Sequence, residues 1–131
     1  MSQPQDKTFR CRLISPERVV LDCEARFVVL PAHDGQIGIG PNRAPLVCKL
    51  GIGAVRVDSP DGSQHYFVDG GFARVRGNEL SIITPKAVAD DQIDRASAEK
   101  LLQQAGDMPL GDPARADVLA RARTQLALTD R

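Results

Sequence analysis

The sequence has no tryptophan, one tyrosine and four phenylalanines. Stacked aromatic side chains are the usual platform for exposed bases, so their scarcity disfavours a site built on stacking. The chain also lacks an excess of either charge, because 17 lysines and arginines balance 17 aspartates and glutamates. Binding to nucleic acid or to an anionic membrane surface needs a basic excess. The composition therefore predicts no nucleic-acid partner and no polybasic membrane anchor.

Long hydrophobic runs are absent as well. No stretch of the sequence approaches the roughly 20 apolar residues that cross a bilayer as a helix. The segment from Met1 to Lys7 is polar and has no apolar core of the kind found in signal peptides. We therefore expect a soluble, cytosolic protein without direct membrane insertion.

Residues that commonly carry catalysis or bind metals are few. Cys11, Cys23 and Cys48 stand in apolar runs without a CxxC pair, so we expect buried thiols and no metal site. His33 falls in a turn-like segment and His65 in an alternating one, and neither belongs to a recognisable catalytic motif. The sequence therefore predicts a protein that is not an enzyme, with a small hydrolase or isomerase that uses a histidine as a remote alternative.

The first two thirds of the chain have the periodicity of strands. Phe9, Cys11 and Leu13 alternate with polar residues, as in a half-buried strand, and short apolar runs continue as far as Thr84. Asp-Gly at 61–62 and Gly-Asn at 77–78 separate these runs as hairpin turns do. The glycines at 35, 38 and 40 lack the lysine and serine of a phosphate-binding loop, so we interpret them as turn residues. Many short strands with frequent turns predict a β-sandwich or barrel.

After Pro85 the periodicity becomes helical. Asp90 and Asp91 are expected to cap a first helix, with Asp94 in its first turn, and Asp112-Pro113 is expected to start a second. The apolar faces are thin and rich in alanine: Ala98, Leu101, Leu102 and Ala105 in the first helix, and Leu119, Ala122 and Leu126 in the second. We therefore expect an α+β, mainly β, protein with a β-sandwich at 1–88 and an αα-hairpin at 89–131.

Burial arithmetic predicts that the hairpin docks and does not fold alone. A buried leucine contributes about 2 kcal/mol and alanine much less, so the hairpin gains on the order of 5 kcal/mol before ordering entropy is subtracted. A weakly docked hairpin beside a stable sandwich is a plausible two-state element.

The order of several motifs resembles one known family. The run LPAHDGQIGIGPNRAPL at 30–46 resembles the signature stretch of epsilon subunits of F-type ATP synthases, and FVDGGF at 67–72 looks like the double-glycine strand crossing of that family. Asn78 falls at a turn where the family usually has asparagine, and residues 13–21 resemble its first hairpin. The resemblance covers nearly the whole chain, in order.

The resemblance implies a fold, a role and partners. The fold is a flattened β-sandwich of about ten strands followed by the helical hairpin. The role is that of a non-catalytic rotor subunit in the central stalk of a proton-translocating synthase, at the cytoplasmic face of the cell (inner) membrane. Its partners are the gamma subunit, the membrane c-ring and, through the hairpin, the catalytic alpha and beta subunits. Carried over by position, Gln36, Asn42 and Arg43 contact the c-ring.

For the hairpin, the resemblance implies regulation. In some members ATP binds the folded hairpin through a motif that matches residues 93–98 here, but Ser97 stands where the motif has arginine. We therefore expect no bound cofactor and weak or absent ATP sensing. The remaining candidates for nucleotide or regulatory contacts are Asp94, Arg95, Arg115, Arg121 and Arg123. The alternative from another class is a free-standing β-sandwich that binds a ligand under a helical lid, and this alternative requires a well-formed pocket.

Overall fold

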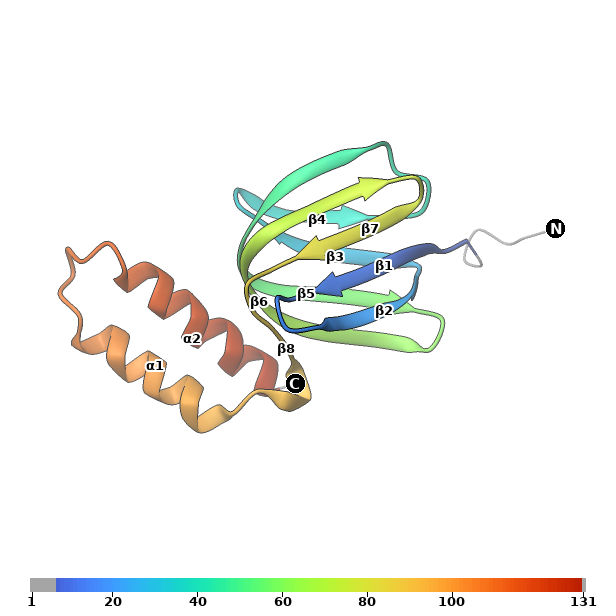
Figure 1. Cartoon of the computed structure of the whole chain (residues 1–131). Helices are drawn as coiled ribbons and strands as arrows, with labels where there is room; N and C mark the ends of the chain where they lie inside the picture. The colour runs from blue at the N-terminus through green and yellow to red at the C-terminus, as the bar shows by residue number, and fades with distance from the viewer. Residues whose placement is uncertain (1–6, 131) are drawn as a thin grey trace.

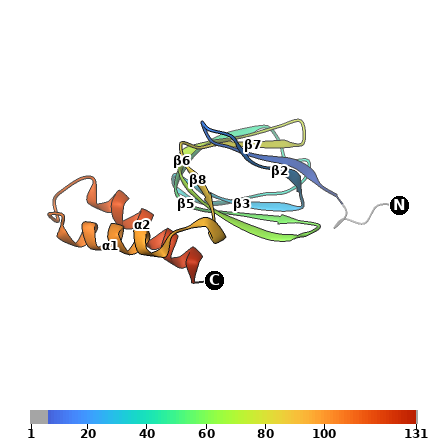
Figure 2. The same cartoon turned by 60° about the horizontal axis from the view of Figure 1, so that its bottom comes forward.

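The computed structural model describes residues 7–130, and the polar N-terminal segment 1–6 and residue 131 lie outside the described residues. A β-sandwich is followed by two helices that project from one of its ends, while the first strand begins at the opposite end (Figures 1 and 2). The elements in chain order are β1 (Phe9–Ile14), β2 (Val19–Ala25), β3 (Phe27–Ala32), β4 (Gly35–Ile39), β5 (Leu46–Ser59), β6 (Gly62–Arg76), β7 (Glu79–Ile83), β8 (Ala87–Ala89), the 3-10 helix η2 (Asp90–Gln92), α1 (Arg95–Asp107) and α2 (Arg115–Thr129).

One hydrogen-bonded sheet folds over to make both layers of the sandwich. The strand order is β2-β1-β7-β6-β5-β3-β4, and β8 pairs with β6 beside this path. The long strands β5 and β6 pair with each other throughout. β7 pairs only with residues 72–76 of β6, whereas β8 pairs only with residues 66–68. The two halves of the long strands therefore belong to different layers.

The strand count differs from the predicted ten because β5 and β6 are continuous. They have 14 and 15 residues, and each contributes one half to each layer. Eight strands therefore form both layers of the sandwich. Strand β4 forms where only turns were predicted. Its Gly38 has no side chain, and the ring of Phe27 on β3 occupies the space that a Cβ would need.

The double glycine marks the point where β6 passes from one layer to the other. Gly70 and Gly71 have φ of +77° and +109°, in the region that favours glycine. A Cβ at Gly71 would collide with the carbonyl oxygen of Ile83 on β7. The close approach of β6 and β7 therefore depends on this residue.

The core lies between the two layers and follows the predicted alternation. Phe9, Cys11 and Leu13 are buried, as the period-two pattern of β1 predicts. Burial raises the pKa of the Cys11 thiol to about 12, whereas Cys23 and Cys48 are only half-buried. Other fully buried core side chains are Val28, Leu30, Val55, Val57, Val68, Leu80 and Ile82.

The helical hairpin forms as predicted, but both helices begin later than expected. Asp90 and Asp91 belong to η2, and the N-cap of α1 is Asp94, whose carboxylate accepts a hydrogen bond from the Ala96 amide. α2 begins at Arg115, after a turn in which Asp112 accepts a hydrogen bond from the Ala114 amide at 2.9 Å. Aspartates therefore do lie at the start of each helix, as predicted, but each helix begins a few residues later than the sequence indicated.

The hairpin packs against the sandwich through α2. α2 contacts β5 and β6, whereas α1 packs on α2. Phe67 lies between the core residues Tyr66 and Val68, so alternation points it away from the core, yet it is fully buried. The contacts of β6 with η2 and α2 explain this burial. We infer that Phe67 is the apolar anchor under the hairpin.

Candidate functional surfaces

The residues predicted to contact the c-ring lie at two ends of the edge strand β4. Gln36 is exposed near the start of β4, and Asn42 and Arg43 are exposed in the loop that follows its end. Arg43 folds back along the strand, and its Nη1 donates a hydrogen bond to the Gly38 carbonyl at 3.0 Å. The three residues therefore share the outer edge of one sheet and do not meet at a single loop tip.

A neighbouring turn holds this loop in position. The amide of Asn42, which has φ of +59°, donates to Oδ1 of Asn78 at 2.8 Å. The side-chain amide of Asn78 in turn donates to the Thr8 carbonyl at 3.0 Å. Asn78 has φ of +60°, a conformation that asparagine tolerates better than most residues. The Asn42–Arg43 loop is thus fixed to the turn between β6 and β7.

One ion pair joins the hairpin to the sandwich among the described residues. Nε of Arg121 on α2 lies 2.8 Å from Oδ2 of Asp69 on β6, and the two side chains are 34% and 23% exposed. Asp69 is two residues beyond Phe67 and therefore projects from the same side of β6. The apolar anchor and the ion pair together hold α2 in its docked position.

The residues at the start of α1 that match the nucleotide-binding motif form hydrogen bonds and ion pairs with other groups of the chain. Oδ2 of Asp94 accepts a hydrogen bond from the Ser97 hydroxyl at 2.7 Å. This bond, helped by the Ala96 amide, holds the pKa of Asp94 below its usual range. The Arg95 guanidinium pairs with Asp130 and with Glu99, and its pKa is raised above the usual value, first by the bond to Asp130. The motif therefore serves as a helix cap with a local salt bridge.

The arginines of α2 have three different environments. Arg115 donates from Nε at 3.1 Å to the Ala105 carbonyl, which also accepts from the Met108 amide at the end of α1. Arg121 pairs with Asp69, as described above. Arg123 is exposed and forms no ion pair within residues 7–130. With Arg95, three of the four predicted regulatory arginines are thus engaged in the docked hairpin.

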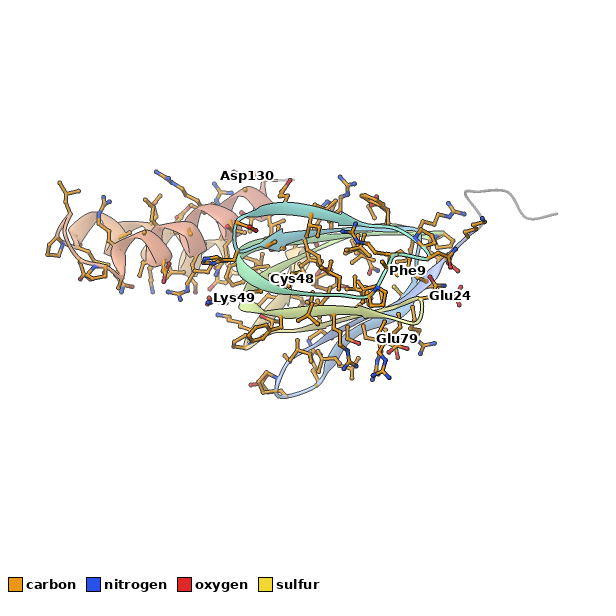
Figure 3. The ribbon with its side chains drawn as sticks, turned by 90° about the horizontal axis from the view of Figure 1, so that it is seen from above. Phe9, Glu24, Cys48, Lys49, Glu79 and Asp130 are labelled. Carbon is orange, nitrogen blue, oxygen red and sulfur yellow. The ribbon has the colours of Figure 1, made fainter. Side chains whose placement is uncertain are left out.

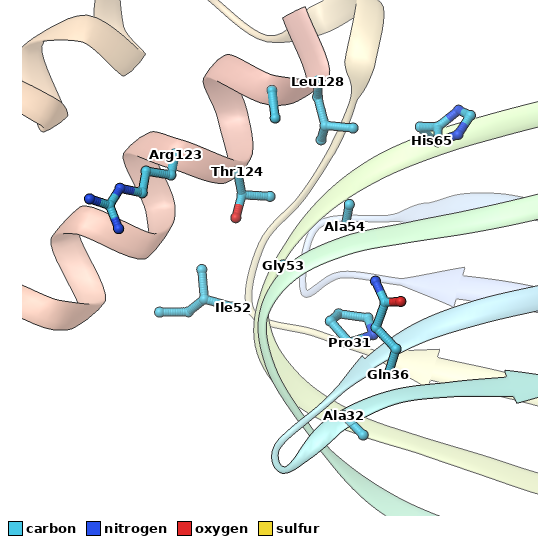
Figure 4. Close-up of a pocket in the computed structure, with 12 residues that line it drawn as sticks. Pro31, Ala32, Gln36, Ile52, Gly53, Ala54, His65, Arg123, Thr124 and Leu128 are labelled. Carbon is cyan, nitrogen blue, oxygen red and sulfur yellow. The ribbon is translucent and has the colours of Figure 1, made fainter. Parts of the chain in front are cut away.

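Three hollows border the hairpin. A cleft of about 590 Å³ lies between α2 and the sandwich, and Figure 4 shows Gln36 and His65 on one side of it and Arg123, Thr124 and Leu128 on the other. A smaller cavity of about 220 Å³ next to Asp94 and Ser97 is lined by one cation, Lys86. Ligand pockets commonly measure about 300–1,000 Å³. The cavity next to Asp94 and Ser97 is therefore small for a nucleotide. A third hollow, of about 360 Å³, lies on the other side of the motif and is lined by Asp90, Asp91, Ile93, Arg95, Leu128 and Thr129.

The outer face of the layer formed by β2, β1, β7 and half of β6 carries an apolar surface that sequence reasoning missed. Phe72 and Ile83 are direct neighbours across β6 and β7, and they are 57% and 55% exposed. Figure 3 places Lys49, the neighbour of Phe72 on β5, at the hairpin end of the sandwich, and Glu24 and Glu79 at the far end. The sequence did contain a signal for this surface. Phe72 and Ile83 are large apolar residues at strand positions that alternation assigns to the solvent side.

Comparison with known proteins identifies the family. Residues 8–90 match the family described as ATP synthase, Delta/Epsilon chain, beta-sandwich domain. The ATP synthase epsilon chain of Rhodopirellula baltica is 42% identical over 123 residues, which cover 91% of this chain and 96% of the relative. The chain belongs to this family. The epsilon chain of Delftia acidovorans is 34% identical over 122 residues, 92% of this chain and 88% of that one.

Solved structures share the fold over nearly the whole chain. A cryo-EM structure of the mitochondrial ATP synthase of Euglena gracilis, which includes the c-ring, matches with a TM-score of 0.72 at 22% identity and covers 96% of this chain and 84% of that one. A structure of the central stalk and c-ring from Tetrahymena thermophila matches with a TM-score of 0.60 at 14% identity and covers 95% of both chains. These similarities confirm a β-sandwich followed by two helices.

Family membership decides between the sequence-based alternatives. As a member of the delta/epsilon family the chain is a stalk subunit of ATP synthase and not a catalytic subunit. The alternatives of a histidine-based enzyme and of a free-standing ligand-binding module are set aside on this ground. Within the described residues no group of three or more potential metal ligands lies together, and no helix is both long and apolar enough to cross a membrane.

Proposed function

We propose that this chain is a rotor subunit of the central stalk, which joins the gamma subunit to the membrane c-ring of a proton-translocating ATP synthase. The observation that carries the proposal is the match over 91% of the chain to an ATP synthase epsilon chain. The similar fold found in assemblies of central stalk and c-ring supports it. The chain then lies peripherally at the cytoplasmic face of the cell (inner) membrane.

The proposed contact with the c-ring runs along the β4 edge. Gln36 and the Asn42–Arg43 pair are exposed on this edge, and the loop that carries the pair is fixed through Asn78. An arginine offers several donors to carboxylate or carbonyl oxygens, and a glutamine can donate and accept. A polar loop of the c-ring could be bound at both ends of β4 by these groups.

The proposed contact with the catalytic alpha and beta subunits is made by the hairpin after it leaves the sandwich. In the docked position Arg121 is paired with Asp69, so undocking would free one cation for acidic groups on another subunit. Arg115 would stay with the hairpin because its partner is the carbonyl of Ala105 on α1. We propose that the Asp69–Arg121 pair sets part of the preference for the docked position.

ATP binding by this hairpin is proposed to be weak or absent. The Ser97 hydroxyl donates to Asp94, and the charge of Arg95 is balanced by the carboxylates of Glu99 and Asp130, which would repel a phosphate. Isothermal titration of the isolated chain with ATP is expected to show no binding at submillimolar concentration. A submillimolar dissociation constant would contradict this part of the proposal.

Capture of the partners tests the stalk role. Tagged full-length chain is mixed with purified gamma subunit, and the captured complex is then offered detergent-solubilised c-ring. We expect gamma to bind first and the c-ring to be retained with it, and we expect substitution of Gln36 and Arg43 by alanine to reduce retention of the c-ring alone. Failure of the wild-type chain to bind gamma would contradict the proposed role.

A further inference from the structure

Two cysteines face each other across the first hairpin of the sandwich. Cys11 on β1 and Cys23 on β2 are direct partners in the antiparallel register of these neighbouring strands (Figure 1). Strand β2 ends the strand order, so this hairpin forms an edge of the sheet. Cys11 belongs to the buried core, and Cys23 packs against that core. The two thiols therefore lie next to each other on the inner face of the hairpin.

The register brings the two backbones within the range that a disulfide spans. Directly opposed residues of an antiparallel pair have Cα atoms about 4.5 or 5.5 Å apart, and disulfides join residues whose Cα atoms are about 4.4–6.8 Å apart. Opposed Cβ atoms lie about 4.5–5.5 Å apart, whereas a disulfide needs about 3.5–4.5 Å. Formation of the bond therefore draws the two Cβ atoms together by about 1 Å and leaves the strand pairing in place.

The third cysteine, Cys48, lies too far away to compete. Cys48 on β5 is the neighbour of Ala73 on β6, and Ala73 is the neighbour of Ile82 on β7, the strand next to β1. Three strand spacings of about 4.8 Å, or about 14 Å in all, therefore separate Cys48 from β1. A disulfide cannot bridge Cα atoms more than about 7 Å apart. Cys48 thus serves as an internal reference thiol.

The two paired thiols differ in their access to solvent. Cys11 is fully buried, and burial raises the pKa of its thiol to about 12. Cys23 is only half-buried, so a reagent in solution meets its sulfur first. Cys11 then lies on the core side of the modified sulfur, within reach of it. The hairpin therefore holds an outer thiol that can meet an oxidant and an inner thiol that can resolve the product.

We propose that Cys11 and Cys23 form a dithiol site that hydrogen peroxide oxidises to an internal disulfide. The thiolate of Cys23 attacks one peroxide oxygen, the O–O bond breaks, and Cys23 becomes a sulfenic acid while hydroxide leaves. The sulfur of Cys11 then attacks the sulfur of Cys23, the S–O bond breaks, and the hydroxyl group leaves as water with the proton of the Cys11 thiol. In sum, two thiols give up two electrons and two protons, and one peroxide becomes two waters.

The disulfide ties the edge strand to the sheet. On the outer face, the exposed pair of Arg10 and Asp22 already joins β1 to β2. The disulfide adds a covalent link on the inner face, closes a loop between Cys11 and Cys23, and so restricts the unfolded chain. It also keeps Cys23 from further oxidation to the irreversible sulfinic and sulfonic acids. Oxidation therefore stabilises this edge and changes no side chain on the outer face.

The test treats the folded, full-length chain with hydrogen peroxide and counts the remaining thiols by alkylation with N-ethylmaleimide after denaturation. We expect the three thiols of the reduced chain to fall to one. Because trypsin cleaves after arginine, the digest of the oxidised chain should contain residues 11–12 linked to residues 19–26. The melting temperature should rise on oxidation. Dithiothreitol should restore both the three thiols and the original melting temperature.

Single substitutions separate the pair from the reference thiol. Cys48→Ser is expected to form the same bond as the wild type and to keep no free thiol after oxidation. Cys23→Ser is expected to form no internal disulfide and to show no rise in melting temperature with peroxide. Both substitutions replace a half-buried thiol, which disturbs the core less than a change at the fully buried Cys11. Circular dichroism of the reduced variants establishes that each is folded.

Several results would overturn the proposed site. The oxidised wild type could keep all three thiols, its linked peptides could contain residues 44–49 with Cys48, or a non-reducing gel could show a dimer joined between chains in place of the internal bond. A lower melting temperature of the oxidised chain would show that the bond distorts the hairpin, and this result also contradicts the proposal. None of these outcomes bears on the stalk role, which the capture of gamma tests independently.

Discussion

At the scale of single residues, Asp94 shows how one side chain sets the start of a helix. Its carboxylate accepts bonds from the Ala96 amide and the Ser97 hydroxyl, and its negative charge lies at the N-terminus of α1, where the helix dipole favours it. These contacts lower the pKa of Asp94 in the folded chain. The stabilisation is therefore complete above the unfolded pKa of about 3.9 and is lost as the pH falls through the lower, folded pKa.

Replacement of Asp94 by asparagine tests this cap. Asparagine keeps a side-chain oxygen at the N-cap position but carries no charge and does not titrate. We expect wild type to be more stable than Asp94→Asn near neutral pH, with a difference that stays constant down to about pH 5 and shrinks below about pH 4. Thermal unfolding across this pH range measures it. A difference that grows as the pH falls would contradict the cap.

The sequence correctly predicted that an aspartate caps the first helix, but it indicated the wrong aspartate. Asp90, Asp91 and Asp94 all precede the apolar face of α1, so each gives the same sequence signal for a cap. The choice among them depends on which carboxylate meets Ser97 and Ala96 in three dimensions, and only Asp94 does so. The pairing of Arg95 with Asp130 was equally invisible, because the two residues are 35 positions apart.

At the scale of elements, the hairpin depends on few contacts with the sandwich. Phe67 provides the apolar anchor and Asp69 the ion pair, and both project from the same side of β6. The apolar stripe expected on α2 was only partly correct. Ala122 is buried as predicted, but the other buried positions are Val118, Gln125 and Leu128, while Leu119 and Leu126 are half-buried.

A double-mutant cycle measures the contribution of the ion pair. Because Asp69 and Arg121 are partly exposed, we expect their coupling energy in thermal unfolding to be about 1 kcal/mol. We also expect Asp69→Asn and Arg121→Gln to make the hairpin more susceptible to limited proteolysis. Arg123→Gln, two residues along α2, should change neither property. A coupling energy near zero would show that the anchor alone holds the hairpin.

Elements with regular patterns were predictable and those with irregular ones were not. The alternation of β1 gave its buried face directly. β4 has the sequence GQIGI, whose glycines weaken the strand pattern, and it pairs with β3, whose Phe27 ring lies over Gly38. β8 has three residues and forms only because β6 offers an edge. Tertiary contacts thus decide the elements that local preference leaves open.

At the scale of the whole molecule, two layers separate two surfaces. One layer carries the β4 edge and the docked hairpin, and the other carries the exposed neighbours Phe72 and Ile83 on its outer face. The family could be recognised from the order of motifs along the chain. The place where Phe72 and Ile83 meet could not, because it depends on the register between β6 and β7.

The central claim is that this chain couples the rotation of the c-ring to the catalytic head, and the most direct test is ion pumping by the synthase. Complex assembled without the chain is reconstituted into vesicles, and ATP hydrolysis and proton uptake are measured before and after the full-length chain is added. We predict hydrolysis with little proton uptake without the chain, and recovery of uptake when it is added. Equal proton uptake per ATP in its absence would contradict the account.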